Sequence, residues 1–188
     1  MSDLIPPEGG EMYSLREVKK EIRVLGIAAR SRPGSAIHAV GVVYRGRLYL
    51  DGVMRTSATG PDITEEVAAM IVESPHRLQI RVILLDTALL HDGVKIDPIR
   101  LSDSLSKPVV VMNTEEPTAP GDEHIQVFTY KQGNTEIPVL SVGLRRQTAA
   151  QVLKIASPAG GTPEALRVSE IIVSAVLDKK YNIMLKRS

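Results

Sequence analysis

Short apolar runs separated by polar turns follow one another along most of the chain, and this pattern predicts a mixed α/β fold. Residues 81–86 read Arg-Val-Ile-Leu-Leu-Asp, with four apolar residues in a row before the acid. Such a run is typical of a central strand buried on both faces. Ligands of open α/β sheets bind beyond the carboxyl ends of parallel strands, so Asp86 is the first candidate for chemistry. The alternative is a strand-end Asp that accepts backbone N–H bonds in the following turn, which we expect over residues 87–93.

Three earlier strands are predicted at residues 21–27, 38–44 and 48–54. The turn at residues 45–47 is short enough for an antiparallel hairpin, which gives a three-strand meander. Residues 28–35, with Pro33 and Gly34, are expected to be the exit loop of the first strand.

Helices and strands alternate after the meander. A helix is predicted from Asp62 to Glu73, with Glu65 completing a capping-box-like start. Asp97 followed by Pro98 predicts the start of a second helix. Alternation of this kind requires parallel pairing through right-handed crossovers. The other predicted elements are strands at 109–112, 125–130 and 139–142, a helix at 148–156, and a final helix at 163–177 capped by Thr162 and packed on the sheet.

Composition narrows the function classes. The chain has 188 residues, enough for one domain, which we expect at 15–188 after a loose arm at 1–14. It has no cysteine, which excludes disulfides, thiolate metal sites and a Cys nucleophile. A net charge of +1 decides nothing about nucleic acid, so any basic surface must be local. No apolar segment approaches the length of a membrane span, and we expect a cytoplasmic protein without membrane contact.

Four motifs, in this order and spacing, resemble an archaeal family related to endonuclease V, sometimes called endonuclease dU. They are Leu-Asp-Gly-Val at 50–53, Leu-Leu-Asp at 84–86, Leu-Ser-Val-Gly at 140–143 and Thr-Pro-Glu-Ala-Leu-Arg-Val at 162–168. The resemblance covers nearly the whole chain beyond the arm. It implies a ribonuclease-H-like fold, in which the first strand and the strand ending at Asp86 lie side by side and parallel. It also implies a Mg²⁺- or Mn²⁺-dependent nuclease that acts on deaminated strands containing uracil or inosine.

The chain departs from this family at three of its site positions. The acid of the first strand is replaced at Ala28, the glutamate falls near Thr56 and Ser57, and the histidine of the Ser-Val-Gly-His motif is Leu144. Asp86 alone remains as catalytic and metal-binding candidate. One carboxylate plus waters holds Mg²⁺ weakly, so we expect two-metal hydrolysis to be weak or lost.

Arginines supply the second set of candidates. Arg30 and Arg32 follow the first strand, and Arg145 and Arg146 follow the Ser-Val-Gly segment. We expect these four guanidinium groups to gather around the cleft and to bind phosphate oxygens of DNA or RNA. The alternative is that they are solvated loop residues.

Other candidates are weaker. Asp51 lies inside the third strand, and His91-Asp92 follows Asp86 in its loop. The other three histidines have no partner at metal-ligand spacing and are expected to be structural or surface residues: His38, His76 and His124. The alternative function is a non-catalytic module that binds nucleic acid, or that uses a sheet edge or the last helix to form a homodimer or dock on a partner.

Overall fold

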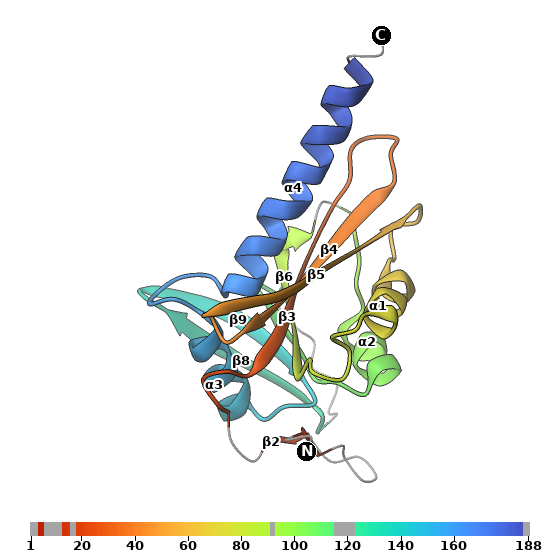
Figure 1. Cartoon of the computed structure of the whole chain (residues 1–188). Coiled ribbons are helices and arrows are strands. Elements are labelled where there is room, and N and C mark those ends of the chain that lie inside the picture. The colour runs from red at the N-terminus through yellow and green to blue at the C-terminus, as the bar shows by residue number, and fades with distance from the viewer. Residues whose placement is uncertain (1–3, 6–12, 16–17, 91–92, 115–122, 186–188) are drawn as a thin grey trace.

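The computed structural model describes residues 4–5, 13–15, 18–90, 93–114 and 123–185. A seven-stranded mixed sheet in the order β5-β4-β3-β6-β7-β9-β8 forms its centre, with helices on both faces (Figure 1). A separate two-stranded sheet pairs β1 (Leu4–Ile5) with β2 (Ser14–Leu15), and Tyr13 N donates to the carbonyl of Gly143 at 2.8 Å. The division of the chain at residue 14 stays a prediction.

The predicted meander is present. Strands β3 (Arg23–Arg30), β4 (Ile37–Arg45) and β5 (Tyr49–Ala58) pair antiparallel in sequence order. The prediction that the first strand ends at residue 27 is wrong. Ala28 and Ala29 are fully buried and pair with β4, because small apolar side chains fit between the sheet and its helices.

Two parallel strands follow the meander. Strand β6 (Val82–Leu90) pairs parallel with β3 on one side and with β7 (Val109–Met112) on the other. The bounds predicted for β7 are confirmed. The prediction that β6 ends at Asp86 is wrong. The strand continues through a register shift and pairs with β3 again at Leu90, which lies opposite Ala29.

The last two strands extend the sheet beyond β7. Strands β8 (Ile125–Gln132) and β9 (Thr135–Val142) form an antiparallel hairpin, and β9 also pairs antiparallel with β7. Both strands were predicted, with shorter bounds. Strand β8 is therefore one edge of the sheet, and β5 is the other.

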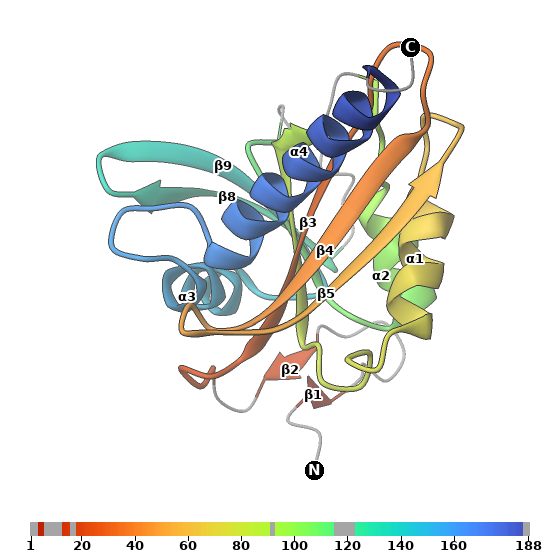
Figure 2. The ribbon, with the colours of Figure 1, turned by 45° about the horizontal axis from the view of Figure 1, so that its top comes forward.

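Each face of the sheet carries two helices. Helices α1 (Thr64–Glu73) and α2 (Pro98–Leu105) cover one face, where apolar residues of β3 and β6 such as Ile27 and Leu85 point. Helices α3 (Arg146–Ala156) and α4 (Glu164–Leu185) cover the other (Figure 2). None of the described helices is long and apolar enough to cross a membrane.

Helix α4 packs closely on β3, as the sequence predicts, although it is longer than expected. Leu166 and Val173 are fully buried against the sheet. A Cβ atom at Gly26 would lie 2.4 Å from the backbone carbon of Ala165. No real Cβ contact is this short, so only glycine allows the helix to approach the strand here.

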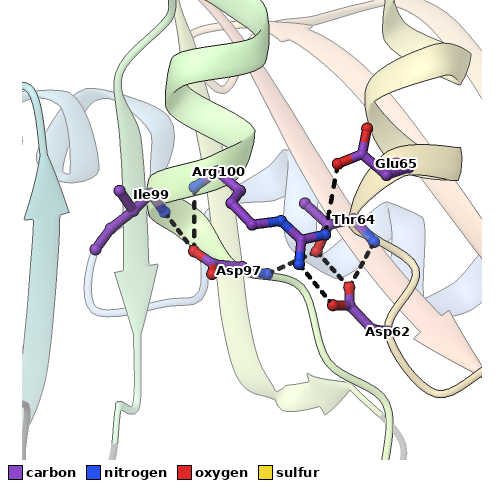
Figure 3. Close-up of polar contacts among 6 residues, drawn as sticks. All are labelled: Asp62, Thr64, Glu65, Asp97, Ile99 and Arg100. Carbon is purple, nitrogen blue, oxygen red and sulfur yellow. Dashed lines mark hydrogen bonds and ion pairs between the residues drawn. The ribbon is translucent and has the colours of Figure 1, made fainter.

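A polar network joins the starts of α1 and α2 (Figure 3). Asp97 caps α2 as predicted, since its Oδ1 accepts N–H bonds from Ile99 and Arg100 at 2.9 and 3.1 Å. Asp62 instead accepts from the backbone and hydroxyl of Thr64, and Arg100 donates to Asp62 Oδ2 at 2.9 Å. The capping box predicted for α1 does not form, because the helix begins at Thr64 and Glu65 faces Arg100.

Candidate active site

Asp86 and Ala28 lie beside each other on adjacent parallel strands. Ile27 of β3 pairs with Leu85 of β6, and Ala28 and Asp86 directly follow this pair, where the register of the two strands begins to shift. Asp86 itself pairs with Met112 of β7. Ala28 packs with Val173 of α4. Because side chains alternate along a strand, Asp86 points to the same face as Leu84, which is the face that α3 and α4 cover. The predicted parallel, side-by-side placement of the two strands is confirmed.

The Asp86 carboxyl group is almost completely withdrawn from solvent. Its residue is 5% exposed. Oδ1 accepts hydrogen bonds from Ala88 N at 2.9 Å and from Asn113 Nδ2 at 2.8 Å. Burial raises the pKa of Asp86, and these two hydrogen bonds offset only part of that rise. The bond from Ala88 is of the turn type that the alternative interpretation of Asp86 predicts.

Asn113 is a site residue that the sequence analysis missed. It directly follows β7 and adopts a left-handed backbone conformation with φ of 54°. Its carbonyl accepts a hydrogen bond from the hydroxyl of Thr87, the residue after Asp86. Its position after the strand adjacent to β6 was the available signal, because carboxyl ends of neighbouring parallel strands meet at one edge.

A second carboxylate reaches the same face from α4. Arg30, two residues beyond Ala28 in β3, donates from Nη2 to Glu170 Oε1, which also accepts from Ser174 Oγ at 3.2 Å. Glu170 Oε2 and Arg30 Nε are buried and have no hydrogen-bond partner among the described residues. The pair therefore neutralises its own charge but leaves hydrogen-bonding capacity unused. No sequence signal identifies Glu170, because the rotation of α4 against the sheet is set by packing.

These residues do not fit a two-ion centre. Such a centre needs carboxylates on both strands, to clamp two hard cations about 4 Å apart. Here Ala28 presents a methyl group, one oxygen of Asp86 is hydrogen-bonded, and Glu170 is paired with a guanidinium. Among the residues that the structure describes, no group of three or more His, Cys, Asp or Glu side chains could hold a metal. Metal binding at Asp86 alone stays a prediction.

The four candidate arginines do not all lie near Asp86. Arg30 is on its face of the sheet, and Arg32 is in the loop that follows the same end of β3, where its backbone N–H donates to Ser35 Oγ at 3.1 Å. Arg145 and Arg146 follow β9, whose last residue pairs with the first residue of β7. They therefore leave the sheet at the end opposite Asp86, and the expected gathering of four is not observed. The reason is the antiparallel direction of β9.

Arg146 has a local contact of its own, with its guanidinium carbon 5.7 Å from the centre of the Phe128 ring. Asp51 also lies away from Asp86, between Arg23 and Arg45, each with a nitrogen 2.8 Å from its carboxylate. Burial would raise the pKa of Asp51, but hydrogen bonds from Arg45 and Arg23 outweigh it and hold that pKa below its usual range.

The histidines offer little to the site. His76 packs against Gly52 of β5, where a Cβ atom would lie 2.2 Å from its Nε2. This contact agrees with the structural role expected for it. His91 and Asp92 lie outside the described residues.

Comparison with known proteins identifies the lineage. The family model described as endonuclease dU matches residues 20–128, more than half of the chain. The chain belongs to the endonuclease dU family. A UPF0215 protein of Methanopyrus kandleri is 32% identical over 186 residues, covering 86% of this chain and 94% of that protein. A UPF0215 protein of Thermococcus kodakarensis is 30% identical over 191 residues, covering 87% of this chain and 96% of that protein.

Solved structures confirm the ribonuclease-H-like fold of this endonuclease dU family member. A protein of unknown function from Archaeoglobus fulgidus superposes with a TM-score of 0.65 at 24% identity, covering 82% of this chain and 97% of that one. Human endonuclease V gives 0.58 at 16% identity and covers 85% of each chain. Ciona intestinalis endonuclease V, in complex with a 24mer DNA containing an inosine, gives 0.58 at 12% identity, covering 84% of this chain and 86% of that one. The predicted fold and family are both confirmed.

Proposed function

We propose that this cytoplasmic member of the endonuclease dU family binds DNA or RNA strands at the face around Asp86, and that metal-dependent cleavage there is weak or absent. Family membership and the fold shared with an inosine-DNA complex support the nucleic-acid part. The observation that carries the second part is the methyl group of Ala28 beside the carboxylate of Asp86 on paired strands.

The Arg30–Glu170 pair offers a way to hold a phosphate without a metal. Guanidinium donors bind phosphate and carboxylate oxygens with similar geometry. A phosphodiester that reached Arg30 could take the place of Glu170 Oε1, which Ser174 would still hold, and could use the free Nε of Arg30. Exchange of one anion for another leaves the half-buried guanidinium paired in both states.

The proposed targets are strands that carry deaminated bases, uracil or inosine, as the family resemblance implies. A direct test incubates the protein with uracil- or inosine-containing DNA and RNA in Mg²⁺ and in Mn²⁺, beside Asp86→Ala. We expect the protein to cleave these strands no faster than its Asp86→Ala variant does. If the protein cleaves them, and both EDTA and the Asp86→Ala substitution abolish this activity, the proposed loss of catalysis is wrong.

Binding is tested separately, by fluorescence anisotropy of labelled strands over a range of salt concentrations. We expect affinity to fall as salt rises, because released counterions drive phosphate binding, and Arg30→Ala to weaken it about tenfold by removing a charge-assisted contact. Lys95→Ala, an exposed lysine near α2, serves as the control. If the logarithm of the affinity does not change with the logarithm of the salt concentration, the proposal of nucleic-acid binding is overturned.

A protein-interaction role has one observation in its favour. The edge strand β5 exposes three large apolar side chains, Tyr49 at 57%, Leu50 at 47% and Val53 at 49%. Exposed apolar edges of this kind pair readily with a second strand. If a homodimer forms there, Val53→Lys should shift the mass measured by light scattering to that of a monomer. Val72→Lys, on the exposed side of α1, should not.

A further inference from the structure

An open groove of about 720 Å³ lies away from Asp86, where three segments meet. They are the tip of the β8–β9 hairpin, the second half of α3 and the loop that leads into α4 (Figure 2). Arg47, from the turn between β4 and β5, closes one side by donating from Nη1 to the carbonyl of Ser157 at 3.2 Å. The volume falls within the range of about 300–1,000 Å³ that is common for small-molecule sites.

The charge of the groove is strongly one-sided. Arg47, Lys131 and Lys154 line it, and no Asp or Glu does. Lys131 pairs with Glu136 at 3.7 Å, but both side chains are largely exposed and such pairs are weak. A chain whose net charge is only +1 therefore concentrates three cations around one concave surface.

A buried hydroxyl and bare backbone complete the site. Ser157 is 5% exposed, and its Oγ has no hydrogen-bond partner among the described residues. Buried hydroxyls are normally satisfied, so this one keeps an unused donor. Ser157 lines the groove, and rotation about its χ1 angle would turn that donor toward a ligand. Gly133 and Gly160 both adopt left-handed conformations, and a Cβ at Gly133 would lie 3.7 Å from the Cα of Gly160. Without side chains at these positions, a ligand can approach the backbone.

We propose that this groove binds the phosphate group of a nucleotide, either a free mononucleotide or one unit of a nucleic-acid strand. Lys154 and Arg47 supply the charge, Ser157 rotates its buried hydroxyl to donate a hydrogen bond to a phosphate oxygen, and Tyr130 also lines the groove. Gln132 and Gln151 line the same groove and carry amide groups able to contact a base. None of the lining residues belongs to β3, β6 or β7, so the site is separate from Asp86.

Calorimetric titration of the full chain with inorganic phosphate, AMP, adenosine and a short single-stranded oligonucleotide tests this. Lys154→Glu should weaken AMP binding at least tenfold, because it removes a cation and introduces a repelling charge. Ser157→Ala should weaken it about tenfold, the typical effect of losing a hydrogen bond to a charged group. Lys95→Ala should leave it unchanged. Circular dichroism melting checks that each variant is folded.

The two sources of phosphate give different results, and both support the site. A mononucleotide site shows AMP binding that the oligonucleotide does not displace, whereas a strand site shows competition between them and loss of both in Lys154→Glu. Adenosine that binds as tightly as AMP would overturn the proposal, as would equal affinities in Lys154→Glu, Ser157→Ala and Lys95→Ala. Because Asp86→Ala should leave AMP binding unchanged, failure here is distinguishable from failure of binding at Asp86.

Discussion

The face around Asp86 and the groove beside α3 differ in how their charges are arranged. At Asp86 a single buried carboxylate stands beside a methyl group, and the nearby Arg30 and Glu170 cancel each other. In the groove, three cations surround open space with no lining acid. Binding a metal cation requires several carboxylates fixed at strand ends, whereas binding an anion requires only cationic side chains and hydrogen-bond donors on turns and helices. Metal binding and anion binding can therefore occur at separate places in this fold.

Introducing an acid at position 28 should have the largest effect on this contrast. Ala28→Asp places a second carboxylate near Asp86 at a fully buried position. Without metal we expect a loss of about 3 kcal/mol or more in the free energy of unfolding, because the new charge is buried and unpaired. Mn²⁺ should recover part of that loss, which thermal melting in EDTA and in Mn²⁺ measures.

Ala29→Asp is the matched control for this experiment. Ala29 is equally buried but belongs to the apolar cluster of the opposite face, under α1 and α2. It should lose stability without recovery in Mn²⁺. Equal responses of the two variants to Mn²⁺ would show that Asp86 and residue 28 do not form a joint site. AMP binding in the groove should be unaffected in folded Ala28→Asp.

Gly26→Ala should produce the next largest effect. The added methyl group would meet the backbone of Ala165, which can yield only if α4 moves. We expect a loss of about 1–3 kcal/mol, the usual range for overpacking, measured by urea denaturation. Gly60→Ala adds a methyl group that meets nothing within 4 Å and should change little. Equal effects at both positions would contradict the close approach of helix and strand.

The Arg30–Glu170 pair should contribute a smaller amount. Arg30 is 38% and Glu170 21% exposed in their side chains, so water screens the pair in part. A double-mutant cycle with Arg30→Met and Glu170→Gln should give a coupling free energy of about 0.5–1 kcal/mol. A coupling near zero would mean that the two charges act independently and that Glu170 does not hold Arg30.

The pH dependence of Asp86 should give the smallest effect. Burial raises its pKa, so the folded state favours the protonated carboxyl, and ionisation lowers stability as pH rises through the folded-state pKa. Asp86→Asn removes this penalty and should therefore be more stable than the parent protein at neutral pH. The difference should disappear below about pH 4, the value for an unfolded Asp. Urea denaturation from pH 4 to 7 measures it, and a difference that grows toward low pH would contradict the buried, uncompensated carboxylate.

The sequence predicts the central part of the fold because apolar runs specify buried strands. Strand β7, the cap at Asp97 and the pairing of the strands that carry Ala28 and Asp86 follow from local patterns. Local patterns do not predict where β3 and β6 end. Alanines and the polar Thr87 extend these strands only because neighbouring strands pair with them and helices pack over them.

The candidate site is less predictable than the fold. Asp86 ends an apolar run and is readily found, but Asn113 and Glu170 reach the site only through tertiary packing. The direction of β9 also decides that Arg145 leaves the sheet far from Asp86, and single-sequence patterns do not fix whether a strand joins its neighbour parallel or antiparallel. The type of a residue indicates which chemistry it can perform, but the topology of the sheet decides which residues lie close together.

The contact between Gly26 and Ala165 has a wider consequence. Main-chain atoms touch there, so the height of α4 above the sheet is held by the backbone rather than by any side chain that mutation could shorten. Substitutions elsewhere in this layer can exchange carboxylates for methyl groups without letting the layer collapse. The spacing between α4 and the sheet is thus independent of which side chain occupies position 28.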